Sequence, residues 1–440
     1  MLFILLQSNS INSLLFWILS IAVSIFFIYL KIKKGRIALI SPGFVFMITW
    51  GIVCISMLFF LGNKDLFQSS LFKGDYHYLS SYVFLFVVVS FIGFSLPNVM
   101  IKQNESEDQW LDYLPESQID SIFNRYRFIF YLNFALALVK LVFIIFTFSP
   151  TSYYHYRQII LSEVFTQDSF TLISIVSRFG YWTQLISGFL VAVLGVKHGI
   201  SQFKFKQAIL YFTLYSAVSL VDGGRVFILQ FSVFYFLPYT LIYLRRGAEI
   251  WTREFKRLFF FLIIIFSLVG VLGVFRSSDR YSQKSSNDLV EKYYYLMNGI
   301  GYTNKILTRV DFNIGNLDFG RNFFNININS TISYRMQIHN KLPRGYENSV
   351  QSIIPYIFFD FGYMGSLAFW AIVCFFIEFI ALRMYRRMSI FKLLIIITLC
   401  RYAFGTFLGN PLPYLVRMFA FIFIVYILKK FLIPRYRYSE

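Results

Sequence analysis

The stretch QAILYFTLYSAVSLVDGGRVFILQFSVFYFLPYTLIYLRR, residues 207–246, decides the fold class. It holds two apolar runs that meet at the turn Gly223-Gly224-Arg225. Runs approaching roughly 20 apolar residues cross a bilayer as helices. An arginine at such depth is costly unless an anion compensates its charge, so it is a functional hypothesis by default. The paired glycines remove side-chain bulk, which would let a large ligand approach the backbone.

The composition of the whole chain agrees with this stretch. Of its 440 residues, 57% are hydrophobic, 21% aromatic and only 14% charged, whereas a soluble chain carries about 25% charged residues. We therefore predict an all-α polytopic membrane protein with about 11 transmembrane helices. The expected spans are residues 12–30, 38–62, 78–100, 126–149, 170–196, 207–222, 226–244, 258–275, 362–384, 389–409 and 413–432.

Basic residues predict the direction of these spans. The net charge is +19, and basic residues are enriched in cytoplasmic loops. Loops holding many of them alternate with loops holding few, which predicts the amino terminus outside and the carboxyl terminus inside. The expected cytoplasmic groups are Lys31, Lys33, Lys34 and Arg36; Lys197, Lys204 and Lys206; Arg245, Arg246, Arg253, Lys256 and Arg257; Arg383, Arg386, Arg387 and Lys392; and Lys429, Lys430, Arg435 and Arg437.

Two classes of site are not indicated. The basic residues are scattered over short loops, so nucleic acid is not an expected partner. The three cysteines, Cys54, Cys374 and Cys400, lie inside apolar runs without disulfide or zinc spacing and resemble small core residues. No cluster of histidine, cysteine or carboxylate residues indicates a metal. The sequence predicts no metal and no cofactor.

One segment, 276–350, is far longer than a connection between spans requires. Structureless loops beyond about 15 residues are usually functional or disordered, and the aromatic residues of this one argue against disorder. We expect a folded cap over an outward-facing cavity, between the eighth and ninth spans. The chain then divides into residues 1–275, which hold spans one to eight, the loop 276–350, and residues 351–440, which hold the last three spans.

Five arginines on the expected outer side are candidate ligands of phosphate. A guanidinium keeps its charge and binds phosphate oxygens in pairs. Two or more converging on one cavity would bind a pyrophosphate and stabilise it as a leaving group. Each alone could instead anchor a lipid headgroup or pair with a carboxylate of a loop. The five are Arg157, Arg225, Arg276, Arg280 and Arg344.

Candidate acid–base residues follow later in the chain. Glu347 precedes an apolar helical run, so it is either the cap of that helix or a general base that takes a proton from a sugar hydroxyl. His339, in the long outer loop, is the alternative base. Asp360 lies at an expected helix break beside Gly362, where it could orient a sugar or pair with an arginine.

The order of these motifs along the chain resembles that in the O-antigen polymerases of the Wzx/Wzy pathway. These polymerases belong to a wider superfamily that also includes the O-antigen ligases. The resemblance lies in Gly223-Gly224-Arg225 continuing to Leu229, in Arg276 leaving the next span, and in the long outer loop. It extends to Glu347-Asn348-Ser349 and to Asp360-Phe361-Gly362 with Gly365. In the ligase branch a histidine precedes Asn-Ser, whereas Glu347 stands there here, which favours the polymerase branch.

The resemblance implies a periplasmic, metal-independent, inverting glycosyltransferase that polymerises undecaprenyl-pyrophosphate-linked repeat units. Its partners would be those lipid-linked glycans and membrane lipids. Whether it works alone or beside a chain-length regulator is left open by the sequence. A flippase or exporter of the same glycan and a structural scaffold are the other classes that the sequence leaves open. The single long outer loop argues against a flippase, and the outer arginines would have no purpose in a scaffold.

Overall fold

The computed structural model describes residues 10–33, 41–61, 76–101, 131–132, 134–139, 141–142, 352–385, 390–406, 419, 422 and 423. The chain divides into two compact units, one of Met1–Ser106 with Leu289–Glu440 and the other of Glu107–Asp288. Only the helical residues between 131 and 142 are described in the second unit. The expected spans from 170 to 275, the span 413–432 apart from three residues, and the outer loop 276–350 lie outside the described residues.

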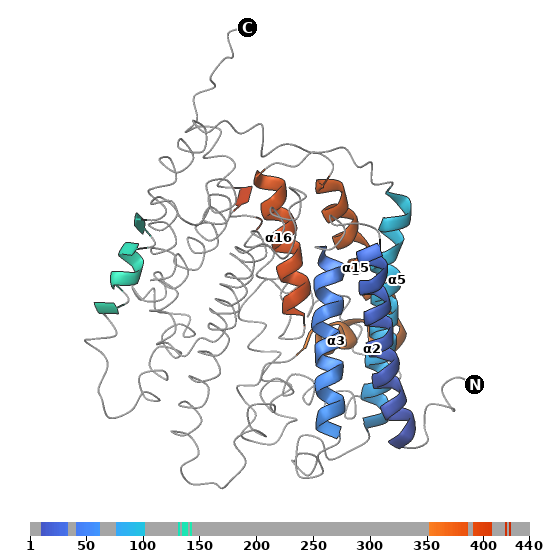
Figure 1. The fold of residues 1–440 in the computed structure, drawn as a ribbon. Helices are drawn as coiled ribbons and strands as arrows, with labels where there is room; N and C mark the ends of the chain where they lie inside the picture. Colours follow the sequence, from blue (N-terminus) through green and yellow to red (C-terminus); the bar gives the residue numbers. More distant parts are fainter. Residues whose placement is uncertain are drawn as a thin grey trace, which may run out of the picture. The chain divides into compact units, whose positions relative to one another are not determined.

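Within the described part of the first unit the elements are α-helices, and they match five of the expected spans. In chain order they are α2 (Ser10–Lys33), α3 (Pro42–Leu61), α5 (Tyr76–Met100), α15 (Ile354–Met384) and α16 (Ile390–Gly405) (Figure 1). The prediction of helical structure for these segments is confirmed.

Three of these helices are long and apolar enough to cross a membrane. The stretches are Ser13–Lys33, Leu79–Met100 and Asp360–Met384, with 21, 22 and 25 residues. At 1.5 Å per residue, each is about as long as the roughly 30 Å of bilayer hydrocarbon is thick. Two shorter apolar stretches, Pro42–Leu58 and Ile395–Gly405, lie in α3 and α16. These helices indicate a membrane protein.

The five helices form one bundle in which early and late parts of the chain lie side by side. The helix α5 contacts α15 and α2, while α3 contacts α2 and α16. Lys31 near the end of α2 bonds to Asn98 near the end of α5, so these two helices run in the same direction. Lys31 also bonds to Glu378, near the end of α15, which therefore runs parallel to them, whereas α3 and α16 run the opposite way (Figure 1). These directions agree with the alternation predicted from charge.

Large aromatic side chains fill the centre of this bundle. Phe46 of α3 is fully buried, and its ring lies within 6 Å of the rings of Trp50, Phe86, Phe94 and Trp370. Rings at such distances attract one another beyond the effect of burial alone. The core thus joins α3, α5 and α15 through ring contacts.

One glycine lets α5 and α15 approach closely. A Cβ placed on Gly93 would lie 2.6 Å from the carbonyl oxygen of Ala371 and 2.8 Å from the Cβ of Cys374. Small residues commonly permit such contact between membrane helices, because close packing drives their association. The cysteines Cys54, Cys374 and Cys400 are all free and buried, which confirms their prediction as core residues.

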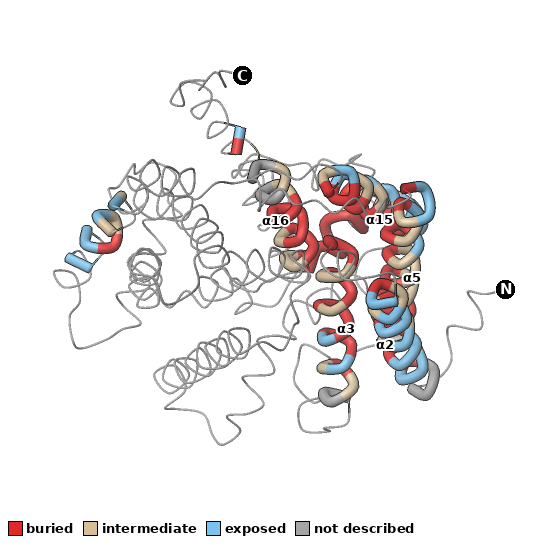
Figure 2. The backbone as a smooth tube through the Cα atoms, turned by 45° about the horizontal axis from the view of Figure 1, so that its top comes forward, coloured by how far each residue is buried: buried red, intermediate tan, exposed pale blue. Residues whose placement is uncertain are grey.

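The outward sides of the helices are apolar as well. Ile25, Phe26 and Tyr29 of α2 are each more than half exposed, and so are Ile372 and Phe376 of α15. In Figure 2, exposed residues follow the outer sides of α2, α5 and α15, and buried residues lie where the helices face one another. A helix that is apolar on all sides is typical of a membrane span.

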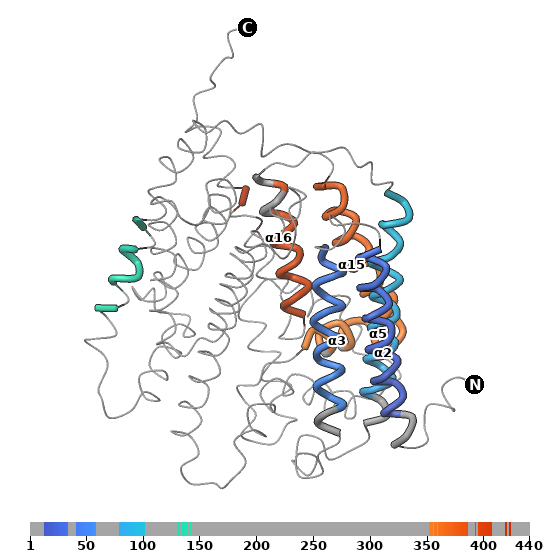
Figure 3. The backbone as a smooth tube through the Cα atoms, in the orientation of Figure 1, coloured from blue at the N-terminus to red at the C-terminus, as the bar shows by residue number. Residues whose placement is uncertain are grey.

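Among the five described helices of the first unit, only α15 changes direction sharply. Its first turns, before Gly362, lie crosswise to the long helices, and the remainder runs beside α5 (Figure 3). We refer to the position of Gly362 as the α15 break. The sequence predicted a helix break there, and the structure confirms it.

Candidate functional site

The described residues include one of the ten predicted site residues. Asp360 lies on α15, two residues before the break, and its side chain is fully buried. It also takes part in an interaction, so it is not a free carboxylate. The other nine lie outside the described residues: Arg157, Gly223, Gly224, Arg225, Arg276, Arg280, His339, Arg344 and Glu347.

The α15 break has a conformation that glycine alone adopts readily. Gly362 has φ 69° and ψ −171°, in a region that costs other residues about 1–3 kcal/mol. Non-helical backbone at membrane depth is tolerated only where protein buries it or where it lines a water-filled cavity. Here Gly362 is buried within the bundle.

Tyr82 of α5 contacts α15 on both sides of the break. Its ring meets Phe358, before the break, and Tyr363, after it, edge-on at centroid distances of 5.7 and 5.2 Å. Its hydroxyl lies 2.6 Å from Oγ of Ser366. Since the single hydroxyl proton of Ser366 is donated to the carbonyl of Tyr363 at 2.8 Å, the Tyr82 hydroxyl is the donor in this pair.

A second contact holds the beginning of α15. No side chain caps this helix at Ile353, but the backbone N–H of Ile353 donates to the carbonyl oxygen of Thr406, just after α16, at 2.7 Å. The hydroxyl of Thr406 accepts a hydrogen bond from the indole of Trp50 at 3.0 Å. The start of α15 is therefore held by partners at the end of α16 and in α3, and not by a capping side chain of its own.

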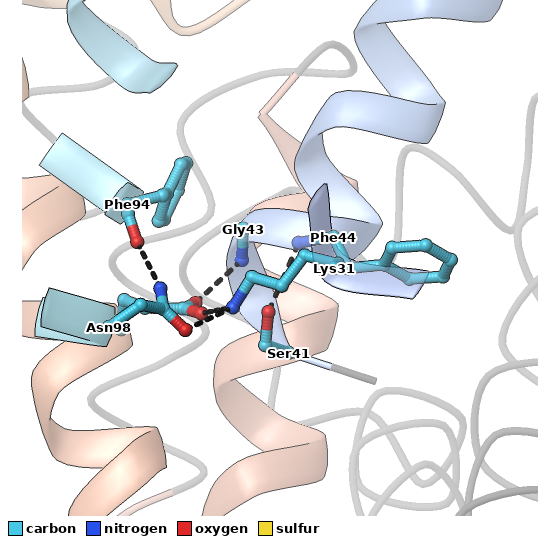
Figure 4. Close-up of polar contacts among 7 residues, drawn as sticks. Lys31, Ser41, Gly43, Phe44, Phe94 and Asn98 are labelled. Carbon is cyan, nitrogen blue, oxygen red and sulfur yellow. Dashed lines mark hydrogen bonds and ion pairs between the residues drawn. The ribbon is translucent and has the colours of Figure 1, made fainter. Parts of the chain in front are cut away.

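At the opposite end of α15, a buried ion pair joins α2 to α15. The ammonium of Lys31 lies 2.5 Å from Oε1 of Glu378, and the two side chains are 3% and 0% exposed. Figure 4 shows Lys31 reaching toward Asn98, whose Oδ1 accepts a second hydrogen bond at 2.8 Å. Lys31 also lies over the ring of Phe27, 5.5 Å from its centroid. Buried charges of this kind are stable only when they are paired and hydrogen-bonded.

The carboxylate of Glu378 also caps a different helix. Its Oε2 accepts the backbone N–H of Gly43 at 2.9 Å, in the first turn of α3, where the side chain of Ser41 accepts the N–H of Phe44 (Figure 4). An anion is favourable at a helix N-terminus and a cation at a C-terminus. We name Lys31, Glu378, Asn98 and Gly43 the charged cluster, in which both charges complement the ends of helices.

The charged cluster corrects the expectation for Lys31, which sequence analysis placed in a cytoplasmic loop. Lys31 lies in the last turn of α2 and is buried, because Glu378 and Asn98 supply the polar partners that water would supply in a loop. The sequence signals one member of this pair: Glu378 is a carboxylate inside an apolar span, and such a residue requires a partner.

The two ends of α15 differ in what they can do chemically. The charged cluster is a closed set of mutual partners, so it serves as an anchor. At the α15 break, the buried Asp360 lies two residues before Gly362, and the hydroxyl of Tyr82 bonds to that of Ser366, four residues after Gly362. Interrupted helices are where membrane transport proteins bind anionic substrates. Within the described ranges, no group of three histidine, cysteine or carboxylate residues could hold a metal ion.

Comparison of the chain with protein-family models, with curated proteins and with solved structures finds no match. The functional argument therefore depends on the residues of this chain.

Proposed function

We propose that this protein is a membrane glycosyltransferase that polymerises undecaprenyl-pyrophosphate-linked oligosaccharide repeat units into O-antigen or a related surface polysaccharide. The reaction would take place at the periplasmic face of the bacterial inner membrane. The proposal is supported by the order of the arginine, glycine and carboxylate motifs in the sequence.

One structural observation carries the proposal furthest: the break at Gly362 beside the buried Asp360. This break lies at the end of α15 opposite to Arg383, and Lys33 ends the parallel helix α2. Since basic residues mark the cytoplasmic side, the break belongs to the outward side in this proposal. An interrupted helix at that level suits a substrate whose lipid part enters from the membrane.

The proposed reaction needs a donor, an acceptor and a base. Arg225 and Arg276 hold the pyrophosphate of the growing chain. A hydroxyl of the incoming lipid-linked unit attacks the anomeric carbon, the bond from that carbon to the phosphate oxygen breaks, and undecaprenyl pyrophosphate leaves. Glu347, or His339 as the alternative, accepts the proton of the attacking hydroxyl. Configuration at the anomeric carbon is inverted by this single displacement.

The remaining predicted residues position the reactants. Arg157, Arg280 and Arg344 contact the second pyrophosphate or the sugars, and Gly223 and Gly224 leave room for the phosphates beside the backbone. Asp360 orients a sugar or fixes one of these arginines.

The test is a polymerisation assay with the purified protein and purified lipid-linked repeat units. Long glycan made without another protein supports the proposal. Transfer of the units across vesicles without elongation would identify a flippase, and transfer of one glycan to a lipid A acceptor without elongation would identify a ligase. Either of the last two results overturns the proposal.

Two substitutions sharpen this assay. Arg225→Lys keeps the charge but loses paired phosphate binding, so we expect turnover to fall at least about tenfold. Glu347→Ala should reduce turnover by a factor of about 10² to 10⁴. The matched control is Arg383→Lys at the other end of α15, where the guanidinium lies 4.9 Å from the ring of Phe379. Full turnover in Glu347→Ala would show that Glu347 is not the base.

A further inference from the structure

Tyr82 of α5 is the described side chain that bridges the α15 break most directly. It contacts Phe358 on one side of Gly362 and both Tyr363 and Ser366 on the other. The tyrosine is fully buried. It is 276 residues away from Phe358 in sequence, by subtraction of the two residue numbers, and it meets both sides only because α5 packs against α15.

The helical segment before the break needs such support from outside. It runs from Ile354 to the residue before Gly362, and isolated helices shorter than about 12 residues are marginal even in favourable sequences. Its beginning is held by the hydrogen bond from Ile353 to Thr406. Near its other end, Phe358 lies against the ring of Tyr82.

Asp360 lies between these contacts and the break. Phe358 is two residues before it and Gly362 two residues after it, so the position of the Asp360 backbone follows that of the segment. The hydrogen bond from Tyr82 to Ser366 sets how the tyrosine ring stands against this segment. Removing that bond would let the ring shift without removing the ring itself.

We infer that Tyr82 is a positioning residue for the predicted site: it holds the segment that carries Asp360 in the orientation that the reaction requires. The inference rests on the proposed polymerase function. Asp360 orients a sugar or fixes an arginine in that proposal, and Tyr82 acts through the segment that carries Asp360. Ser366 contributes to the same positioning, because its hydroxyl accepts the hydrogen bond of Tyr82 and donates to the carbonyl of Tyr363.

The variant that tests this is Tyr82→Phe, which removes only the hydroxyl. A misplacement of about 1 Å can reduce a rate by about a hundredfold, so we expect kcat to fall by a factor between about 10 and 100. KM should change little, because Tyr82 is not among the predicted pyrophosphate ligands. Ser366→Ala should have the same effect, and the double variant should be no slower than Tyr82→Phe alone.

The matched control is Tyr402→Phe in α16. Tyr402 is also a buried tyrosine of this bundle, but its hydroxyl has no hydrogen-bond partner in the part of the chain that the structure describes. Loss of this hydroxyl should leave kcat unchanged. Equal kcat losses in the two variants, or losses by Tyr82→Phe and Ser366→Ala that multiply in the double variant, would overturn the inference.

A second readout separates the inference from the proposed function. Met364, just after the break, is 74% exposed, and a spin label on Met364→Cys reports motion there; the three native cysteines are buried. We expect Tyr82→Phe to increase the mobility of the label and Tyr402→Phe to leave its spectrum unchanged. If the parent protein makes no glycan, the proposed polymerase function is refuted. If the spectrum of the label is unchanged in Tyr82→Phe, the positioning role of Tyr82 is refuted.

Discussion

The two ends of α15 are held in different ways. At one end, Glu378 is bonded to a charged side chain and to the backbone of another helix. At the other end, the break at Gly362 is spanned by the neutral hydroxyls and rings around Tyr82. Between the two ends, the indole of Trp370 donates to Ser90 of α5 at 2.8 Å.

This difference implies that the end of α15 at the charged cluster is held more strongly than the end at the break. The charged cluster complements the ends of three other helices, so displacement of α15 there would leave charges unpaired in an apolar interior. A neutral hydrogen bond between membrane helices contributes only about 0.6 kcal/mol on average. The hydrogen bond at the break is therefore expected to contribute less to stability than the charged cluster at the opposite end.

The largest expected effect comes from removing one charge of the anchor. Lys31→Met leaves the carboxylate of Glu378 buried with only the N–H of Gly43, and breaking a buried pair in this way costs about 3–5 kcal/mol. We expect the free energy of unfolding, measured by denaturant titration in mixed micelles, to fall by this amount.

A double variant makes this test stricter. Lys31→Met with Glu378→Gln removes both charges but keeps a side-chain oxygen for the N–H of Gly43, so it should recover most of the lost stability. Lys33→Met is the control, because Lys33 is exposed on the same turn of α2. A double variant less stable than Lys31→Met alone would contradict the role of the charged cluster as an anchor of α15.

The second effect concerns the break itself. Gly362→Ala places a side chain on a backbone with φ 69°, which should cost about 1–3 kcal/mol or straighten α15. Gly51→Ala is the control in α3: its new Cβ would lie 3.4 Å from Ser24, an ordinary contact, and should stabilise the helix by about 0.5–1 kcal/mol. Thermal unfolding of both variants in the same detergent checks the difference. Equal midpoints would show that the break imposes no strain on alanine.

The smallest effect is expected midway along α15. Ser90→Ala removes the acceptor of the Trp370 indole, and we expect a loss of about 0.6 kcal/mol, with about 1.7 kcal/mol as the upper end for such bonds. The same titration measures it. A loss of unfolding free energy as large as that of Lys31→Met would show that a neutral hydrogen bond and the buried ion pair contribute equally. The contrast between the two ends of α15 would then be wrong.

The apolar runs predicted the positions of most of the described helices. Their lengths located α2, α3, α5 and α16 to within a few residues at most ends, because a span in a bilayer must be both long and apolar. The exception is α15, which begins at Ile354, eight residues before the expected span 362–384. Its crosswise segment is held by Thr406 and Tyr82, and partners so distant in sequence leave no periodic pattern.

The candidate site was predictable only in part. The pattern Asp360-Phe361-Gly362 located the break, because glycine beside polar residues interrupts an apolar helix. The roles of Tyr82 and Lys31 could not be predicted, since 31 tyrosines and 41 basic residues gave no reason to select them. Their partners Ser366 and Glu378 are 284 and 347 residues away, and only the packed bundle brings them together.

The pairing of Lys31 with Glu378 has a consequence for how the chain is made. Ribosomes add about 5–20 residues per second, so the 347 residues that separate the two take about 17–70 s to synthesise. During this interval the newly made α2 carries an ammonium without its counter-ion. The nascent helix must keep that group at the headgroup level or beside the insertion machinery until the late carboxylate emerges.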